Sequence, residues 1–193
     1  ELPRGWAGKT HACSRLAAAA HGEWLLFVDA DTRHSPWSAL LALAEARRRG
    51  VDFLSTFPRQ RIGSLGEALT VPFIYWILFL LLPLPLVRRS RLPAFAAACG
   101  QFLLVRRSAY EACGGHAARP DSLHDGVHLA RRLKAAGFRI DLCDLADEVE
   151  CRMYRGFREC WRGFRRNAYQ AMGSTGVLLL MTLLQVGLFV LPF

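Results

Sequence analysis

The chain has 193 residues, enough to bury one good core, so its length requires no second domain. It combines 52% hydrophobic residues with 25 Lys and Arg against 16 Asp and Glu, a formal net charge of +9. Arginine clusters at residues 88–91 and 152–166 each adjoin an apolar run. That placement is typical of charge beside a bilayer, so it favours a membrane and argues against nucleic acid as the partner.

The six cysteines form no C-x-x-C pair and have no histidine at zinc-finger spacing. We interpret them as reduced thiols and expect the functional face to lie in the cytoplasm, at a bacterial cytoplasmic membrane. The first residue is Glu1 rather than Met, and no signal peptide or targeting motif follows. We therefore expect a segment upstream of this sequence.

The first third of the chain alternates helices and strands. An alanine-rich helix is predicted over 10–20, and the apolar run Trp24 to Val28 predicts a buried strand. A second helix is predicted from a Ser35 N-cap to Gly50, followed by a strand over 51–57. This order implies an α/β domain built on a mostly parallel, Rossmann-like sheet with flanking helices.

The pattern continues in the second half of the chain. Residues 97–105 are expected to form a strand, and a helix is predicted to begin at Asp125 and to end at Gly137. A short strand over 138–143 follows. We expect residues 1–172 to form one partial catalytic domain.

Three further segments point to a membrane. Residues 71–87 carry no charge and contain three prolines, and residues 175–193, also uncharged, are predicted to form a transmembrane helix. Residues 154–172 are predicted to form an aromatic and arginine-rich helix. The spacing of its aromatic residues fits an interfacial helix, and an ordinary core-facing amphipathic helix is the alternative.

Asp29 and Asp31 follow the buried strand directly, at positions i and i+2. Side chains with this spacing point to the same side where a strand ends, so the two carboxylates can share one divalent cation. Hard oxygen ligands favour Mg²⁺ or Mn²⁺, which usually bind substrate phosphates as well. A turn with two solvated aspartates is the structural alternative.

Several motifs occur along residues 3 to 172, and their order and combination are specific. The sequence resembles the family 2 glycosyltransferases of GT-A fold, and within them the bacterial subgroup associated with hopanoid and carotenoid biosynthesis. The residues that carry the resemblance are Gly5-Trp6-Ala7-Gly8-Lys9, Trp24 through Asp31, Gly100 through Arg107, Tyr110, Gly114-Gly115-His116 and His124-Asp125.

The resemblance implies an inverting transfer from a nucleotide-sugar donor to a lipid or polyisoprenoid-type acceptor. It assigns Asp29 and Asp31 to the metal and the donor diphosphate, and it makes Asp125 the general base. Without the resemblance, Asp125 would be read as a helix-start aspartate favoured by the helix dipole.

Other residues receive binding roles. Lys9 is assigned to the diphosphate or the nucleotide, although an exposed loop lysine fits equally well, and the match assigns Gly100 and Gln101 to substrate binding. His116 and His124 are candidates for the acceptor cleft, with surface polar residues as the alternative.

Two departures from the family pattern are informative. Members often have Glu-Asp at the base, whereas His124 precedes Asp125 here. The Q-x-x-R-W motif of processive synthases is absent, and the nearest stretch is residues 162–166. This absence favours transfer of a single sugar.

The middle apolar segment is constrained by topology. If Asp29 and Asp125 serve one site, the chain between them crosses a bilayer an even number of times, and the 17 residues of 71–87 are too few for two crossings. The hypothesis is a re-entrant or in-plane segment, broken at Pro83 and Pro85.

A rival hypothesis comes from a different class of protein. Family members carry an N-terminal strand-helix unit that helps to form the nucleotide pocket, and this sequence lacks it. The chain could thus be a non-catalytic, membrane-anchored partner module of a glycan or lipid assembly system.

Overall fold

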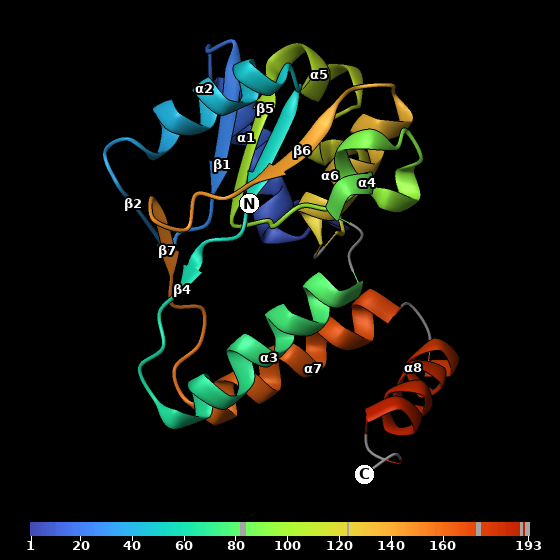
Figure 1. The fold of residues 1–193 in the computed structure, drawn as a ribbon. Coiled ribbons are helices and arrows are strands. Elements are labelled where there is room, and N and C mark those ends of the chain that lie inside the picture. The colour runs from blue at the N-terminus through green and yellow to red at the C-terminus, as the bar shows by residue number, and fades with distance from the viewer. Residues whose placement is uncertain (82–83, 123, 173–174, 190, 192–193) are drawn as a thin grey trace. The chain divides into compact units, whose positions relative to one another are not determined.

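The computed structural model covers residues 1–193 and describes all of them except 82–83, 123, 173–174, 190 and 192–193 (Figure 1). The chain divides into two compact units. The first comprises residues 1–61 and 75–153, and the second comprises residues 62–74 and 154–193. The predicted site residues all belong to the first unit.

The first unit contains a four-stranded sheet in the order β1-β5-β3-β6. Its strands are β1 (Trp24–Val28), β5 (Phe102–Arg106), β3 (Phe53–Thr56) and β6 (Ile140–Cys143). β3 and β6 pair in parallel, but β5 lies between β1 and β3 and is antiparallel to both. The prediction of a mostly parallel sheet was therefore wrong. The long connection between β3 and β5 lets the chain return in the opposite direction, which the regular helix-strand alternation did not predict.

Helices cover both faces of this sheet (Figure 1). The side chains of β5 alternate between the faces, as expected for a strand. Leu103 and Val105 belong to the apolar cluster on the side of α1 (Gly8–Ala19), α5 (Arg107–Ala112) and α6 (Asp125–Ala135). Phe102 and Leu104 belong to the cluster on the side of α2 (Ser38–Arg49). Both faces of β5 are apolar for this reason, and its first four residues are buried, whereas Arg106 at its end is half-buried.

The helices predicted near residues 10–20, 35–50, 125–137 and 154–172 begin within three residues of the expected positions. α2 ends at Gly50, whose φ of 62° is the left-handed conformation that glycine adopts without strain. Its start lies three residues after the predicted N-cap, because the Ser35 side chain bonds Glu148 and accepts the Trp37 N–H. α6 begins at Asp125, as predicted.

A second, three-stranded sheet lies beside the end of β1. It has the order β2-β7-β4, with β2 (Thr32–His34) antiparallel and β4 (Arg59–Gln60) parallel to β7 (Val149–Cys151). Two 3₁₀ helices, η1 (Pro93–Phe95) and η2 (His116–Ala118), complete the described elements of this region.

The middle apolar segment is mostly helical. α3 spans Leu65–Leu81 with Pro72 inside it, and α4 spans Leu84–Arg89 with Pro85 near its start. The predicted break at Pro83 lies outside the described residues. α3 begins earlier than the apolar run because Ser64 and Glu67 form a capping box: the Glu67 N–H donates to Ser64 Oγ, and Glu67 Oε2 accepts the Gly63 N–H at 2.7 Å.

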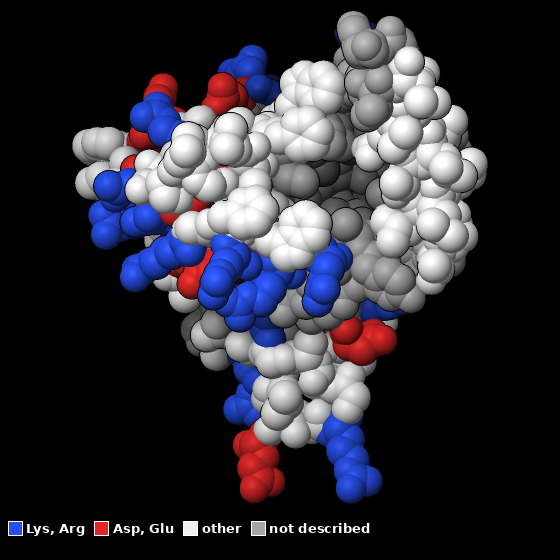
Figure 2. All heavy atoms as spheres, turned by 90° about the horizontal axis from the view of Figure 1, so that it is seen from below, with Lys and Arg blue, Asp and Glu red and all other residues white. Residues whose placement is uncertain are grey.

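The second unit also contains α7 (Phe157–Met172) and α8 (Thr175–Phe189), which contact each other. Only part of the predicted aromatic stripe of α7 faces outward: Phe157 and Trp161 are exposed, whereas Phe164 packs edge-on against Tyr154. The exposed arginines of this region lie beside those outward-facing rings, and Figure 2 shows basic side chains next to uncharged surface.

The transmembrane helix predicted for residues 175–193 is not found. α8 has 15 residues, and at about 1.5 Å per residue it is shorter than the roughly 30 Å hydrocarbon core of a bilayer. In the part of the chain that the structure describes, no helix combines the length and the apolar character needed to cross a membrane.

Candidate active site

Asp29 follows β1 directly and is fixed by backbone hydrogen bonds on both sides. Its N–H donates to the Gln101 carbonyl at 3.3 Å, and its carbonyl accepts the Thr32 N–H at 3.1 Å. The Thr32 hydroxyl donates to the same carbonyl at 2.6 Å. These bonds hold the turn that carries the half-buried Asp29 carboxylate and the exposed Asp31.

Lys9 lies in the first turn of α1, where the start of the helix is attached to the segment before α6. The Ala7 N–H donates to the Pro120 carbonyl at 2.8 Å, and the Thr10 hydroxyl donates to the same carbonyl. This attachment places the Lys9 ammonium 2.7 Å from Asp29 Oδ1 and 3.2 Å from Asp125 Oδ2. The Lys9 ammonium also donates to the Gly100 carbonyl at 3.0 Å.

Asp125 is the first residue of α6, and its side chain is only 5% exposed. The start of this helix packs closely on the turn at Gly100. A Cβ on Gly100 would lie 2.9 Å from Asp125 Oδ1 and 3.2 Å from Lys9 Nζ, and a Cβ on Gly126 would lie 3.1 Å from the Gly100 backbone. Because a side chain at either position would collide, Gly100 and Gly126 are both needed for Asp125, the candidate base, to approach Lys9.

The charges of these side chains perturb one another. Burial raises the pKa of Asp29 more than Lys9 lowers it, and repulsion from Asp125 and Asp31 adds to the rise. Burial would also raise the pKa of Asp125, but the His116 ring and Lys9 outweigh it, so the pKa of Asp125 is lowered. For Lys9, burial lowers the pKa, but the attraction of Asp125 and Asp29 prevails and the pKa is raised.

Negative charge exceeds positive charge at this end of β1, because two carboxylates, those of Asp29 and Asp125, pair with the Lys9 ammonium and the Asp31 carboxylate lies near Asp29. The oxygens of Asp29 and Asp31 are hard ligands of the kind that Mg²⁺ and Mn²⁺ take in proteins. The donor set and the charge excess thus fit a divalent cation held by these two residues.

The structure brings four of the six predicted site residues into contact around one side chain. Asp29, Gly100 and Asp125 each contact the ammonium of Lys9. Asp31 is close enough to raise the pKa of Asp29. The Gln101 side chain is buried, and its amide donates at 3.1 Å to the Sγ of Cys151, which in turn interacts with Asp31. The Gln101 carbonyl accepts the Asp29 N–H.

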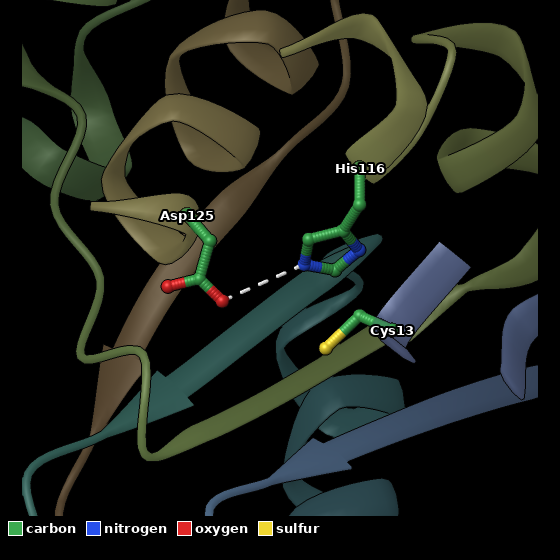
Figure 3. A group of neighbouring side chains, drawn as sticks. All are labelled: Cys13, His116 and Asp125. Carbon is green, nitrogen blue, oxygen red and sulfur yellow. Dashed lines mark ion pairs between the residues drawn. The ribbon is translucent and has the colours of Figure 1, made fainter. Parts of the chain in front are cut away.

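Two residues near His116 and Asp125 received no role from the sequence: Cys13 was not singled out, and Tyr110 was named only as part of the family resemblance. Cys13 lies one helical turn after Lys9 on α1, a spacing that could have indicated a shared face. Tyr110 is on α5, and its hydroxyl is 2.9 Å from His116 Nδ1. Figure 3 shows the side chains of Cys13, His116 and Asp125 directed toward one another.

The two predicted acceptor-cleft histidines differ in their surroundings. His116 is buried, with Nε2 3.7 Å from Asp125 Oδ2. A small pocket beside it is lined by Thr10, His116, Ser122 and Asp125, with Arg119 and His128 among the other lining residues. His124 does not line this pocket.

Residues 1–114 match the model of a family described as glycosyl transferase family 2. The match covers more than half of the chain, so the chain belongs to this family. No curated protein matches the chain.

Two solved structures are similar. The mannosyltransferase PcManGT from Pyrobaculum calidifontis, in complex with GDP-Man and Mn²⁺, is 20% identical with a TM-score of 0.56, over 84% of this chain and 41% of that one. Mannosyl-3-phosphoglycerate synthase from Rubrobacter xylanophilus is 21% identical with a TM-score of 0.40, over 80% and 46%. The chain thus spans about two fifths of the mannosyltransferase. The first likeness shows an α/β, GT-A-like fold, here with mixed sheets and flanking helices.

Proposed function

We propose that the chain is the catalytic core of an inverting glycosyltransferase that moves a single sugar from a nucleotide-sugar donor to a lipid-type acceptor at a membrane. One observation carries the proposal. Asp29 and Asp125, far apart in the sequence, are both bonded by the ammonium of Lys9. The two carboxylates with the proposed metal and base roles therefore belong to one site.

The donor end of the site is assigned to Asp29, Asp31 and Lys9. The two aspartates would hold Mg²⁺ or Mn²⁺, which supplies Lewis-acid stabilisation of the charge on the leaving diphosphate. Lys9 is exposed enough to reach a diphosphate while it remains beside Asp29. The Mn²⁺ and GDP-Man in the similar mannosyltransferase support this assignment.

The acceptor end of the site is assigned to Asp125. Its lowered pKa keeps the carboxylate ionised near neutral pH, so it can accept the proton of the attacking hydroxyl. The rigid start of α6 orients it, and its burial keeps competing water away. Gly100 admits the carboxylate to this position because a side chain there would collide with it.

The membrane part of the proposal rests on the second unit. Phe157 and Trp161 are exposed on α7, with Arg158 and Arg162 exposed beside them. Such a surface favours the interface of a membrane with anionic lipid. We therefore place the protein at the cytoplasmic face of the bacterial membrane, with a polyisoprenoid-type acceptor of the hopanoid or carotenoid kind.

Calorimetry on the full-length protein, with GDP and UDP in the presence and absence of Mn²⁺, tests the donor assignment. We expect one of the two nucleotides to bind. This binding should require Mn²⁺ and should be lost in Asp31→Asn. Asp125→Asn should retain that binding within about threefold and lose roughly 10²- to 10⁴-fold in turnover, the range for loss of a general base.

The outcomes separate this proposal from its rival. Near-normal turnover of Asp125→Asn would remove the base assignment. Absence of binding by both nucleotides would favour the non-catalytic, membrane-anchored module instead.

A further inference from the structure

We propose that Cys13, His116 and Asp125 form a second cation site, suited to a zinc-like divalent ion and separate from the Asp29 and Asp31 pair. The three residues come from α1, η2 and the start of α6, and each offers one ligand atom (Figure 3). These atoms all lie within 4.8 Å of one another, and all three residues are buried.

One buried polar atom in this group, His116 Nε2, has no hydrogen-bond partner among the described residues, and the nearby Asp125 Oδ2 has the Lys9 ammonium at 3.2 Å as its ion-pair partner. Their side chains are 1% and 5% exposed, and the two atoms are 3.7 Å apart, too far for a hydrogen bond. Buried polar groups are normally paired, so the unpaired His116 Nε2 is an exception that needs a reason. A cation bound between it and the Asp125 carboxylate would give this nitrogen a partner.

The surroundings of His116 match those of a metal-binding histidine. Its Nδ1 is 2.9 Å from the Tyr110 hydroxyl, which also accepts the His116 backbone N–H at 3.1 Å. A phenol oxygen can accept two hydrogen bonds, so it can hold Nδ1–H and leave Nε2 free for a metal. Such outer partners commonly orient ligating histidines.

The mixture of ligand atoms selects the ion. A thiolate, an imidazole and a carboxylate suit Zn²⁺ and related ions, whereas Mg²⁺ prefers oxygen alone. Ligand atoms of these types around a tetrahedral Zn²⁺ are roughly 3.3–3.6 Å apart, so the His116 and Asp125 atoms, at 3.7 Å, are near that spacing and the widest pair in the group must close by about 1.5 Å at most. The cation would displace the proton of the Cys13 thiol to solvent.

Lys9 does not prevent this binding. Its ammonium is 3.2 Å from Asp125 Oδ2, but it keeps two other acceptors, Asp29 Oδ1 and the Gly100 carbonyl. His116 and Asp125 also line the neighbouring small pocket together with Ser122, so the group lies at the edge of a pocket. A consequence for activity rests on the proposed function. A bound cation would occupy the Asp125 carboxylate that serves as the base, and sugar transfer would stop.

Cobalt(II) titration of the reduced, tag-free, full-length protein tests the site. Co²⁺ reports on zinc-type sites, and a thiolate ligand gives a charge-transfer absorption band in the near ultraviolet. We expect such a band to saturate at one equivalent, to be displaced by Zn²⁺ and to persist in excess Mg²⁺. Cys13→Ser should lose the band, and Tyr110→Phe should weaken Co²⁺ binding about tenfold through loss of the His116 partner.

The controls use residues outside the group. Cys160→Ser removes another fully buried thiol, and Asp31→Asn alters the other cation site, so both should keep the band. Circular dichroism would verify the fold of each variant. A band that persists in Cys13→Ser, or no band in the unaltered protein, would overturn the site. Because the readout is metal absorption, these results stand whether or not the nucleotides bind with Mn²⁺.

Discussion

Gly100 sets the spacing between Asp125, the candidate base, and Lys9. Because an added Cβ would lie 2.9 Å from Asp125 Oδ1, we expect Gly100→Ala to displace the carboxylate and to lower turnover at least tenfold. The colliding atoms are side-chain ends and Lys9 can swing away, so the stability loss should be only about 1 kcal/mol. Urea denaturation and steady-state kinetics would measure the two effects.

Alanine substitutions at two other glycines serve as comparisons for Gly100→Ala. Gly126→Ala would press a Cβ against the Gly100 backbone, which cannot move as a side chain does, so it should cost more stability than Gly100→Ala. Gly187 lies in α8 with nothing within 4 Å of an added Cβ, so Gly187→Ala should be neutral or stabilising by up to about 1 kcal/mol. Equal turnover in Gly100→Ala and the unaltered protein would contradict the spacing role.

For single residues, the sequence predicted which charged side chains meet at the site better than it predicted their uncharged neighbours. The motif order indicated Lys9, Asp29 and Asp125, and the structure brings them together. The position of Cys13 and Tyr110 beside His116 was not predicted, although Tyr110 belongs to the family motifs, because it depends on how α1 and α5 pack, which no local pattern encodes. The assignment of Gln101 to substrate binding stays a prediction; its side chain donates to Cys151, a contact that no local pattern in the sequence indicates.

The end of α2 is joined to the sheet by a charge cluster. Hydrogen bonds from Arg48, and then from Arg49, lower the pKa of Glu45 to about 2 against the opposing effect of burial. Arg49 also donates to Asp141 on β6 at 2.8 Å. Since the folded-state pKa lies below the usual 4.5, the ionised Glu45 stabilises the fold at neutral pH, and this stabilisation is lost as pH falls from about 4.5 toward 2.

We therefore expect Glu45→Gln to lower the free energy of unfolding at pH 7, by less than about 1 kcal/mol because solvent screens the cluster. The difference from the unaltered protein should narrow as the pH is lowered through 4 to 3. Urea titrations at several pH values would measure it. Glu111→Gln, which removes a 3.7 Å pair with Arg107 on α5, is the matched control and should change nothing measurable. A difference that grows on acidification would refute the assignment.

Elements with strong local signals were predicted closely, and elements that depend on distant pairing were not. The apolar run from Trp24 to Val28 is β1 without any shift, and Gly50 ends α2. The direction of β5 could not be predicted, because a strand's local pattern is the same in either orientation. The capping box at Ser64 and Glu67 was readable in the sequence, and it would have placed the start of α3 before the apolar run.

For the molecule as a whole, the net charge of +9 and the exposed aromatic and basic surface of α7 predict binding to anionic vesicles. Arg158→Gln with Arg162→Gln should weaken that binding roughly 30-fold, since each basic residue near the surface contributes about 1 kcal/mol. Added salt should weaken binding as well, because it screens the attraction. Vesicle co-sedimentation with and without anionic lipid would measure both effects.

The paired variant Arg15→Gln with Arg131→Gln removes the same charge from exposed positions in the first unit. It should leave vesicle binding within about threefold, because those residues are not assigned to the interface. Equal weakening by both double variants would show that net charge alone is responsible and would remove the specific role of α7.

The place of β5 between β1 and β3 also has a consequence for how the protein is made. During synthesis, β1 and β3 emerge from the ribosome long before residues 102–106, the strand that pairs with both. Until that strand arrives, the nascent chain must carry two apolar strands with unpaired edges, a state prone to aggregation. Since β6 joins later still, sheet assembly depends on distant contacts, and slow folding that benefits from a chaperone is expected.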